Sequence, residues 1–158
     1  MNRIILAGAL VAAITPQALA QQPSNECTAE SCPAGTRAVT NFKKSDPYYA
    51  CPTRELATYV ATVTGLVEMQ ASLGVTPNIS DKTGEPEYEG ETKAIVDSMR
   101  AQAQVQTFDQ ALSICTLGSN KRKVAVMNMP KDSLVAYVYD DGRKTAFWMP
   151  IGNLNKTK

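Results

Sequence analysis

Glutamates alternate along one short stretch of the chain, at Glu85, Glu87, Glu89 and Glu91. A pair of carboxyl groups can perform acid–base chemistry on a glycosidic bond, provided that apolar surroundings raise the pKa of one of them. Residues 75–90 carry two prolines and two glycines and read as an exposed acidic loop, which would not supply such surroundings. Calcium is also disfavoured, because Asp81-Lys82-Thr83-Gly84 departs from the EF-hand ligand spacing. We therefore predict no catalytic residue, no metal ligand and no cofactor.

The chain contains no histidine. This excludes Ser-His-Asp and Cys-His catalysis, and it removes the commonest ligand of zinc and haem sites. The sequence therefore leans away from an enzyme. An exported hydrolase that uses carboxylates or tyrosine remains the alternative.

Four cysteines supply the other reactive side chains: Cys27, Cys32, Cys51 and Cys115. The first pair has the spacing C-x4-C, whereas redox-active pairs are typically C-x2-C. An even number of cysteines in an exported chain predicts two structural disulfides, whose pairing depends on the elements that carry them.

Residues 1–20 have the pattern of a secretory signal peptide. Arg3 precedes an apolar run over residues 4–14, and Ala18-Leu19-Ala20 matches the small-x-small cleavage site. The apolar run is shorter than the roughly 20 residues that span a bilayer. We expect cleavage after Ala20, a periplasmic or secreted protein, and no transmembrane segment in the mature chain.

Charge in the mature chain is balanced in total but unevenly placed. Without Arg3, 15 of the 16 basic residues remain, equal to the 15 acidic residues. Residues 81–97 have a local net charge of −4, and residues 118–158 have +5. A neutral total argues against general nucleic-acid binding, which needs a dense basic surface.

Apolar spacing predicts one helix over residues 53–73 and a second over 91–117. The apolar side of the second helix changes direction partway, so either it breaks near 101–104 or its halves pack against different neighbours. An antiparallel helical hairpin would bring Cys51 close to Cys115. We therefore favour Cys51–Cys115 with Cys27–Cys32. The alternative is Cys32–Cys51 with Cys27–Cys115.

Three β-rich runs follow, over residues 123–129, 133–140 and 143–150, and predict a three-stranded antiparallel sheet. Asp141-Gly142 is typical of a two-residue hairpin turn. That turn would pair residues whose numbers sum to 283, such as Tyr137 with Ala146. A further hairpin is expected from residues 36–42 and 48–50.

This register sorts the side chains onto two faces. One face is aliphatic or phenylalanine, and we expect it to pack on the helices: Leu134, Ala136, Val138, Phe147 and Met149. The other is the candidate binding face: Val135, Tyr137, Tyr139, Lys144, Ala146 and Trp148. Aromatic rings with polar tips are favoured at interfaces. The amino-terminal hairpin could instead cover this second face.

The predicted fold class is α+β, with a disulfide-pinned helical hairpin packed on a C-terminal three-stranded antiparallel sheet. Residues 21–158 form a single domain in which a cysteine-containing loop or hairpin over 21–50 precedes the helices. The predicted function is binding of a protein partner in the cell envelope, as an inhibitor, an immunity factor or an accessory component of secretion or conjugation. A small-ligand-binding module, with an apolar pocket between helices and sheet, is a further alternative. The oligomeric state is left open.

Overall fold

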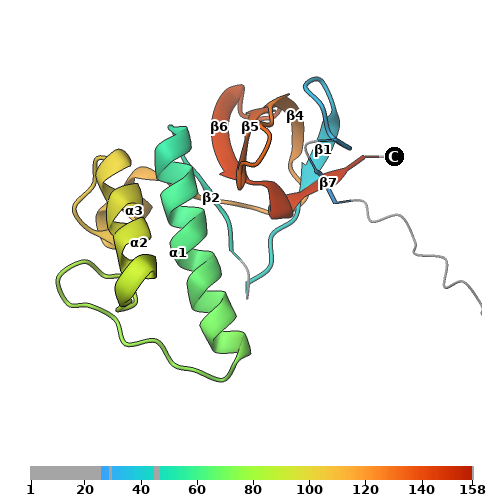
Figure 1. Cartoon of the computed structure of the whole chain (residues 1–158). Coiled ribbons are helices and arrows are strands. Elements are labelled where there is room, and N and C mark those ends of the chain that lie inside the picture. Colours follow the sequence, from blue (N-terminus) through green and yellow to red (C-terminus); the bar gives the residue numbers. More distant parts are fainter. Residues whose placement is uncertain (1–25, 29, 45–46, 158) are drawn as a thin grey trace, which may run out of the picture.

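A computed structural model describes residues 26–28, 30–44 and 47–157. Three helices lie on one side of a curled antiparallel sheet (Figure 1). The predicted signal peptide, over residues 1–20, lies outside the described residues. No helix in the described part of the chain is long and apolar enough to cross a bilayer.

The main sheet has five strands rather than the expected three. Its order is β6-β5-β4-β1-β7, and every neighbouring pair is antiparallel. The three predicted strands are confirmed as β4 (Lys123–Asn128), β5 (Val135–Asp140) and β6 (Thr145–Pro150). Two more strands extend the sheet beyond β4, namely β1 (Arg37–Thr40) and β7 (Leu154–Lys156). The run 36–42 was predicted as a strand but with another partner, whereas β7 was missed because it is short and lies far from β1 in sequence.

The β5–β6 hairpin has a longer turn than predicted. Tyr137 pairs with Trp148 and Asp140 pairs with Thr145, so four residues form the loop. The Asp140 carboxylate holds this loop, because its Oδ1 accepts hydrogen bonds from the backbone N–H groups of Gly142 (2.8 Å) and Arg143 (3.1 Å). Lys144 ends the loop with a positive φ of 57°. The register is therefore shifted by two residues, which leaves the side chains of the paired residues on their predicted faces, whereas Lys144 lies in the loop and not on the binding face.

The predicted hairpin of residues 36–42 with 48–50 is wrong. β1 lies between β4 and β7, whereas β2 (Tyr49–Ala50) pairs with β3 (Thr116–Leu117). Cys51 then joins this small ribbon to the main sheet by exchanging two backbone hydrogen bonds with Trp148 (2.8 and 2.9 Å). An isolated hairpin is barely stable in water, and these distant partners provide the burial that it lacks.

Helix α1 (Arg54–Ser72) follows the predicted spacing. Thr53 caps it by accepting a hydrogen bond from the backbone of Leu56 (3.3 Å), and Gly74 follows it at a positive φ of 72°. Its buried stripe consists of Leu56, Ala57, Tyr59, Val60 and Val63.

The predicted 91–117 helix is two helices, α2 (Gly90–Gln102) and α3 (Phe108–Ile114). The chain turns at Gln104, whose φ is 58°, and Thr107 caps α3. The break turns Val96 of α2 and Ala111 of α3 toward the same core against α1. At 100° per residue, a straight helix would have pointed Val96 and Val105, which both belong to this core, in opposite directions.

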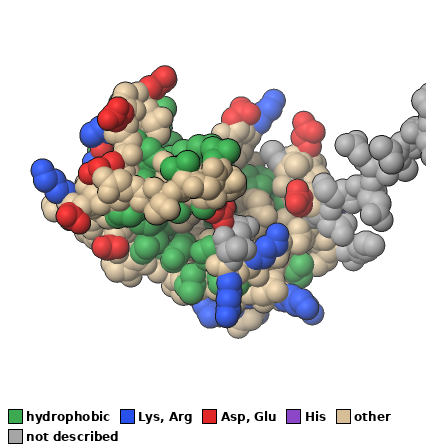
Figure 2. Space-filling model, turned by 90° about the horizontal axis from the view of Figure 1, so that it is seen from below, with side chains coloured by type: hydrophobic (Ala, Val, Ile, Leu, Met, Phe, Trp, Pro, Cys, Tyr) green, Lys and Arg blue, Asp and Glu red, His purple; other side chains and the backbone are tan. Residues whose placement is uncertain are grey.

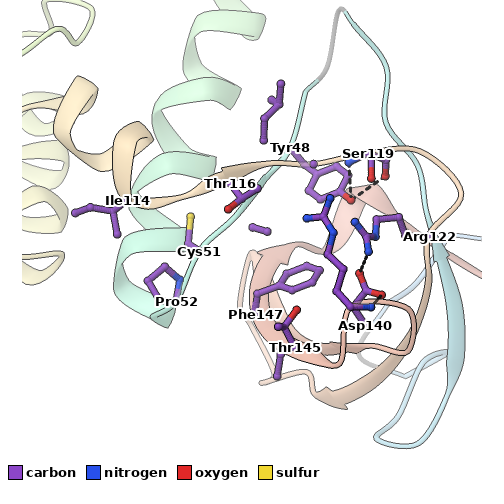
Figure 3. Close-up of a pocket in the computed structure, with 15 residues that line it drawn as sticks. Tyr48, Cys51, Pro52, Ile114, Thr116, Ser119, Arg122, Asp140, Thr145 and Phe147 are labelled. Carbon is purple, nitrogen blue, oxygen red and sulfur yellow. Dashed lines mark hydrogen bonds and ion pairs between the residues drawn. The ribbon is translucent and has the colours of Figure 1, made fainter.

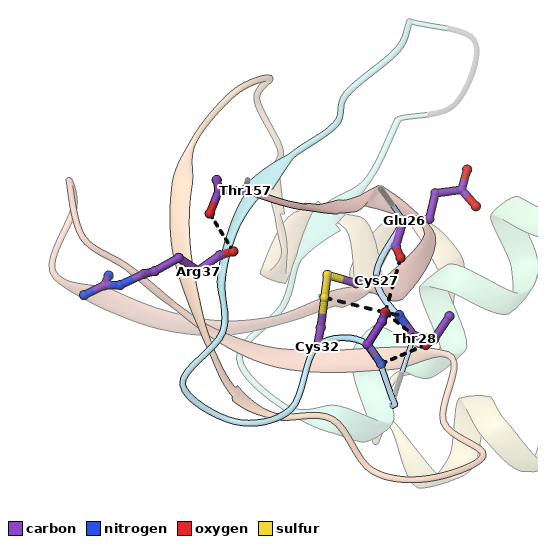
Figure 4. Close-up of a disulfide and its surroundings, with 7 residues drawn as sticks. Glu26, Cys27, Thr28, Cys32, Arg37 and Thr157 are labelled. Atoms are coloured by element: carbon purple, nitrogen blue, oxygen red, sulfur yellow. Dashed lines mark hydrogen bonds between the residues drawn. A yellow bond between two sulfur atoms is a disulfide. The ribbon is translucent and has the colours of Figure 1, made fainter. Parts of the chain in front are cut away.

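Both favoured disulfides are present, Cys51–Cys115 and Cys27–Cys32. The first links the end of α3 to the ribbon that enters α1. The second closes a small loop (Figure 4). This loop lies beside β7, where the Cys27 N–H donates to the Leu154 carbonyl (3.0 Å). Two structural disulfides are typical of proteins from an oxidising compartment.

The core has two parts, one between the sheet and the helices and one inside the curled sheet. The face expected to pack on the helices lies in the second part. Ala136, Val138 and Met149 pack inside the curled sheet, against both cysteines of the Cys27–Cys32 loop. Val135, from the opposite face, instead belongs to the helical core. The expectation that the aliphatic face packs on the helices is therefore wrong. The strands of the sheet curl around this aliphatic face, and the Cys27–Cys32 loop packs against it in place of the helices.

Candidate functional site

The larger side chains of the predicted binding face fall into two groups. Val135 is fully buried in the helical core, and Trp148 is half-buried against that core while its backbone bonds to Cys51. Both residues hold the sheet to the helices. Tyr137 and Tyr139 are half-buried, and Lys144 is exposed in the hairpin loop. Val135 is therefore inaccessible to a partner, and Trp148 is engaged in the helical core on one side, whereas Tyr137, Tyr139 and Lys144 are not part of that core.

Tyr137 and Tyr139 lie on the outer side of the sheet. Tyr139 pairs with Ala125 of β4 on one side and with exposed Ala146 of β6 on the other. The Tyr137 ring packs beside that of Trp148, with centroids 5.1 Å apart. We call Tyr137, Tyr139, Ala125 and Ala146 the tyrosine face. The two alanines flank Tyr139 and are too small to cover its phenol ring, so that ring can contact a partner.

Cations border the tyrosine face. Arg37 of β1 pairs in register with Ala125, which places Arg37, Ala125, Tyr139 and Ala146 in one row across four strands. Lys123, two residues before Ala125, is exposed. Arg37 is exposed too and forms an ion pair with Asp141. This surface therefore combines phenol rings with positive charge.

The acidic loop contains a buried carboxylate, contrary to expectation. Glu85 is 4% exposed and accepts hydrogen bonds from the Tyr59 hydroxyl and from Arg100. Arg100 also donates to Asp97 (2.5 Å), which in turn pairs with Lys93. The loop and α2 together line a polar cavity of about 480 Å³ around these groups. The loop is thus fastened to α1 and α2 through its one buried glutamate.

Electrostatics in this network favour a structural role. Burial, followed by the hydrogen bond to Glu85, raises the pKa of Tyr59 well above its usual value. Hydrogen bonds from Lys93 and Arg100 lower the pKa of Asp97. A glycosidase acid needs a shift in the opposite direction, and Arg100 already bridges the two carboxylates. Among the described residues, no three metal-ligating side chains lie close enough to hold an ion.

A cleft of about 350 Å³ separates the β2–β3 ribbon from the end of the β5–β6 hairpin. Figure 3 shows Tyr48 and Ser119 on one side of it and Asp140, Thr145 and Phe147 on the other. The Tyr48 hydroxyl donates to the Ser119 carbonyl (2.9 Å) and accepts from the Ser119 N–H (3.1 Å).

The ribbon approaches the Tyr48 ring at Gly118. A Cβ added there would lie 2.2 Å from a ring carbon, so only glycine fits. This wall of the cleft is therefore fixed in place.

Two arginines supply charge to the cleft. Arg122 pairs with buried Asp140 (2.5 Å), and its side chain is 18% exposed. Burial acts to raise the pKa of Asp140, but the hydrogen bonds from Arg143, Arg122 and Gly142 outweigh it and hold that pKa below its usual value. Arg143 itself is exposed, and its guanidinium has no hydrogen-bond or ion-pair partner among the described residues.

Sequence reasoning missed this cleft because its walls come from segments up to 99 positions apart in the chain, from Tyr48 to Phe147. The available signals were local, namely Gly118 before a strand and Arg143 in a hairpin turn. Neither pattern shows by itself that the two segments face each other.

A second exposed apolar region lies at the end of α1, where Met69, Leu73 and Val75 are 53%, 72% and 50% exposed. Figure 2 shows hydrophobic side chains gathered in the middle of the face that is seen from below, with acidic side chains at the end that carries α2. No cation borders Met69, Leu73 and Val75 in sequence, which distinguishes them from the tyrosine face.

Comparisons of the chain with protein-family models, with curated protein sequences and with solved structures give no significant match.

Proposed function

We propose that this chain is an exported, non-enzymatic protein that binds a protein partner through the tyrosine face. The observation that carries the proposal is the row in which half-buried Tyr139 lies between Ala125 and exposed Ala146, with Arg37 at its end. Tyrosine and arginine are enriched at protein interfaces, because each combines a large contact area with hydrogen-bonding groups. The surrounding cations favour a partner with an acidic surface.

The proposed compartment is the periplasm or the extracellular space, reached through a signal peptide cleaved after Ala20. Two disulfides support an oxidising environment. Within the cell envelope, the protein would serve as an inhibitor, an immunity factor or an accessory component of a secretion or conjugation system. These roles share one physical requirement, which is a rigid surface that recognises another protein.

The test is affinity capture from the native compartment, followed by binding measurements with the purified partner. Tyr137→Ser and Tyr139→Ser should each weaken binding about tenfold, as expected for interface residues that carry more than about 1 kcal/mol. Their melting temperatures should stay close to that of the wild type. Leu73→Ser is the matched control, because it removes a 72%-exposed apolar side chain at the far end of α1.

Three results would overturn the proposal. The first is a failure to capture any partner, and the second is binding that the tyrosine substitutions leave unchanged. The third is a loss of binding in Leu73→Ser that equals the loss in the tyrosine variants. Trp148→Ala serves as a stability control, since this residue packs on the helical core and its truncation should lower the melting temperature.

A further inference from the structure

We propose that the cleft between the β2–β3 ribbon and the β5–β6 hairpin binds an acidic, extended segment of the protein partner, with one carboxylate on Arg143. This inference rests on the proposed function, since the partner is the same protein. It adds a second site and a chemical requirement, namely an aspartate or glutamate flanked by apolar residues.

The charge of the cleft is the first reason. Asp140 is the acidic residue that lines it, and its carboxylate is already occupied by Arg122 and by the backbone N–H groups of the hairpin loop. The guanidinium of Arg143 therefore remains as uncompensated positive charge. A guanidinium binds a carboxylate through two parallel hydrogen bonds, which gives direction as well as attraction.

The hairpin loop fixes the backbone from which the Arg143 side chain extends. The Arg143 N–H is held by Asp140 Oδ1 at 3.1 Å, and Asp140 itself is 1% exposed. The backbone at Arg143 is thus ordered before any partner arrives. Ordering a binding group in advance lowers the entropy cost of association.

The walls of the cleft are the second reason. Ile114 and Leu117 line one wall and are 48% and 54% exposed, and Phe147 lines the opposite wall. Apolar walls beside a cation suit a chain with alternating apolar and acidic side chains. A free inorganic anion would leave these side chains exposed to water.

An open strand edge is the third reason. The backbone N–H and C=O of Trp148 point toward Cys51. Alternate residues of a strand direct these groups to the same edge, so the N–H and C=O of Ala146 also point to the edge of β6 that faces the ribbon. The residue that would pair with Ala146 is Thr53, but Thr53 has already turned away to cap α1. A bound peptide could continue the ladder at this point.

Ala146 also connects the two sites. It lines the cleft, and it is the exposed alanine beside Tyr139 on the tyrosine face. A partner docked on the tyrosine face is therefore next to the cleft and can place a loop or strand in it. This continuity favours a protein segment over a separate small ligand.

The probe is the N-acetylated, C-amidated hexapeptide Val-Thr-Leu-Glu-Val-Thr, titrated into the ¹⁵N-labelled mature protein and followed by NMR. We expect a Kd of about 1 mM and shifts confined to Gly118, Ser119, Thr145, Ala146 and Phe147. The same peptide with glutamine in place of glutamate should bind about tenfold more weakly, because a charge-assisted hydrogen bond is lost.

Arg143→Gln is the decisive variant, since the Arg143 side chain supports no described contact of the fold. It should weaken the glutamate peptide about tenfold and leave the glutamine peptide unchanged, which is the signature of a direct pair. Lys131→Gln is the matched control, because it removes an exposed cation from a different loop. An unchanged NMR spectrum outside the cleft shows that each variant is folded.

The proposal fails if the glutamate peptide gives no shifts at about ten times the expected Kd. It also fails if Arg143→Gln and Lys131→Gln weaken binding equally, or if inorganic phosphate alone reproduces the same shifts and affinity. Tyr139→Ser separates the two proposals, because it should spare the hexapeptide while weakening the intact partner. If the hexapeptide binds in a way that depends on Arg143 but no partner is captured, the proposed function is refuted, whereas the assignment of the cleft as a site for an acidic peptide stands.

Discussion

The Cys51–Cys115 disulfide closes a 64-residue loop and joins the helices to the sheet, so its removal tests how the two parts of the core are held together. Cys51 is 1% exposed and bonds to the backbone of Trp148, while Cys115 follows directly after α3. The Cys27–Cys32 disulfide is the natural comparison. It is also buried, but its sequence separation is only 5.

Loop closure gives the size of the expected difference. Constraining the unfolded chain stabilises a protein by an amount that grows with the logarithm of the loop length. This amounts to about 4 kcal/mol for the Cys51–Cys115 loop and about 2 kcal/mol for the Cys27–Cys32 loop. Because all four sulfur atoms are buried, the loss of packing is similar in both pairs and largely cancels. The two double variants should therefore differ in their free energy of unfolding by about 2 kcal/mol.

The assay compares urea unfolding of Cys51→Ala/Cys115→Ala with that of Cys27→Ala/Cys32→Ala. Alanine avoids placing an unpaired hydroxyl group in the core. The first variant should lose more free energy of unfolding and should show the steeper denaturant dependence, since its unfolded chain expands further. Equal losses, or a larger loss for the Cys27–Cys32 variant, would refute the loop-closure reasoning.

Three further outcomes follow from the buried polar groups and the close contacts. Glu85→Ala should destabilise the fold by about 3 kcal/mol in thermal or urea unfolding, because it leaves the buried Tyr59 hydroxyl without its acceptor and removes one of the two carboxylates that pair with the mostly buried Arg100; a change below about 1 kcal/mol would mean that the network is solvated. Tyr59 has a raised pKa, so the folded protein holds its proton more tightly than the unfolded chain does, and stability should fall as the pH rises above about 10. Tyr59→Phe should flatten that decline, and an unaltered pH profile would contradict it. Gly118→Ala should cost about 2 kcal/mol, because its Cβ would meet the Tyr48 ring, whereas Gly152→Ala has open space and should be nearly neutral.

The cysteine pairing was predictable because it depends on helix direction. Two consecutive antiparallel helical segments bring the entry of the first next to the exit of the second, where Cys51 and Cys115 lie. The helix caps were predictable for a related reason. Thr53 satisfies the N–H of Leu56, three residues away, so the local sequence contains the whole interaction.

The sheet was predictable in part. Alternation of side chains placed Tyr137 and Trp148 on one face, and the structure keeps them there. The turn could not be read from Asp141-Gly142 alone, because the buried Asp140 carboxylate binds the loop N–H groups and makes it two residues longer. The role of each face was also beyond local reasoning, because it depends on which distant segments cover it.

The accessible part of the predicted binding face was narrower than expected. Local pattern grouped Val135 and Trp148 with the tyrosines, since all four share one side of the hairpin. The helical core buries Val135 and packs against half-buried Trp148, whereas Tyr137 and Tyr139 lie outside that core. The burial of Glu85 has the same origin, because Tyr59 and Arg100 reach it from two helices.

The sequence by itself determined α1, the three carboxy-terminal strands and the presence of two disulfides, because each follows from residue types and their spacing along the chain. It favoured the pairing Cys51–Cys115 with Cys27–Cys32, which the structure confirms. It also excluded histidine-based chemistry. Only the tertiary structure decided that β1 and β7 complete the sheet, that α1 packs on Val135, and that a cleft opens beside Arg143. Periodicity shows which side of an element is apolar. Which distant element covers that side depends on the burial and pairing of the whole chain, which no local window contains.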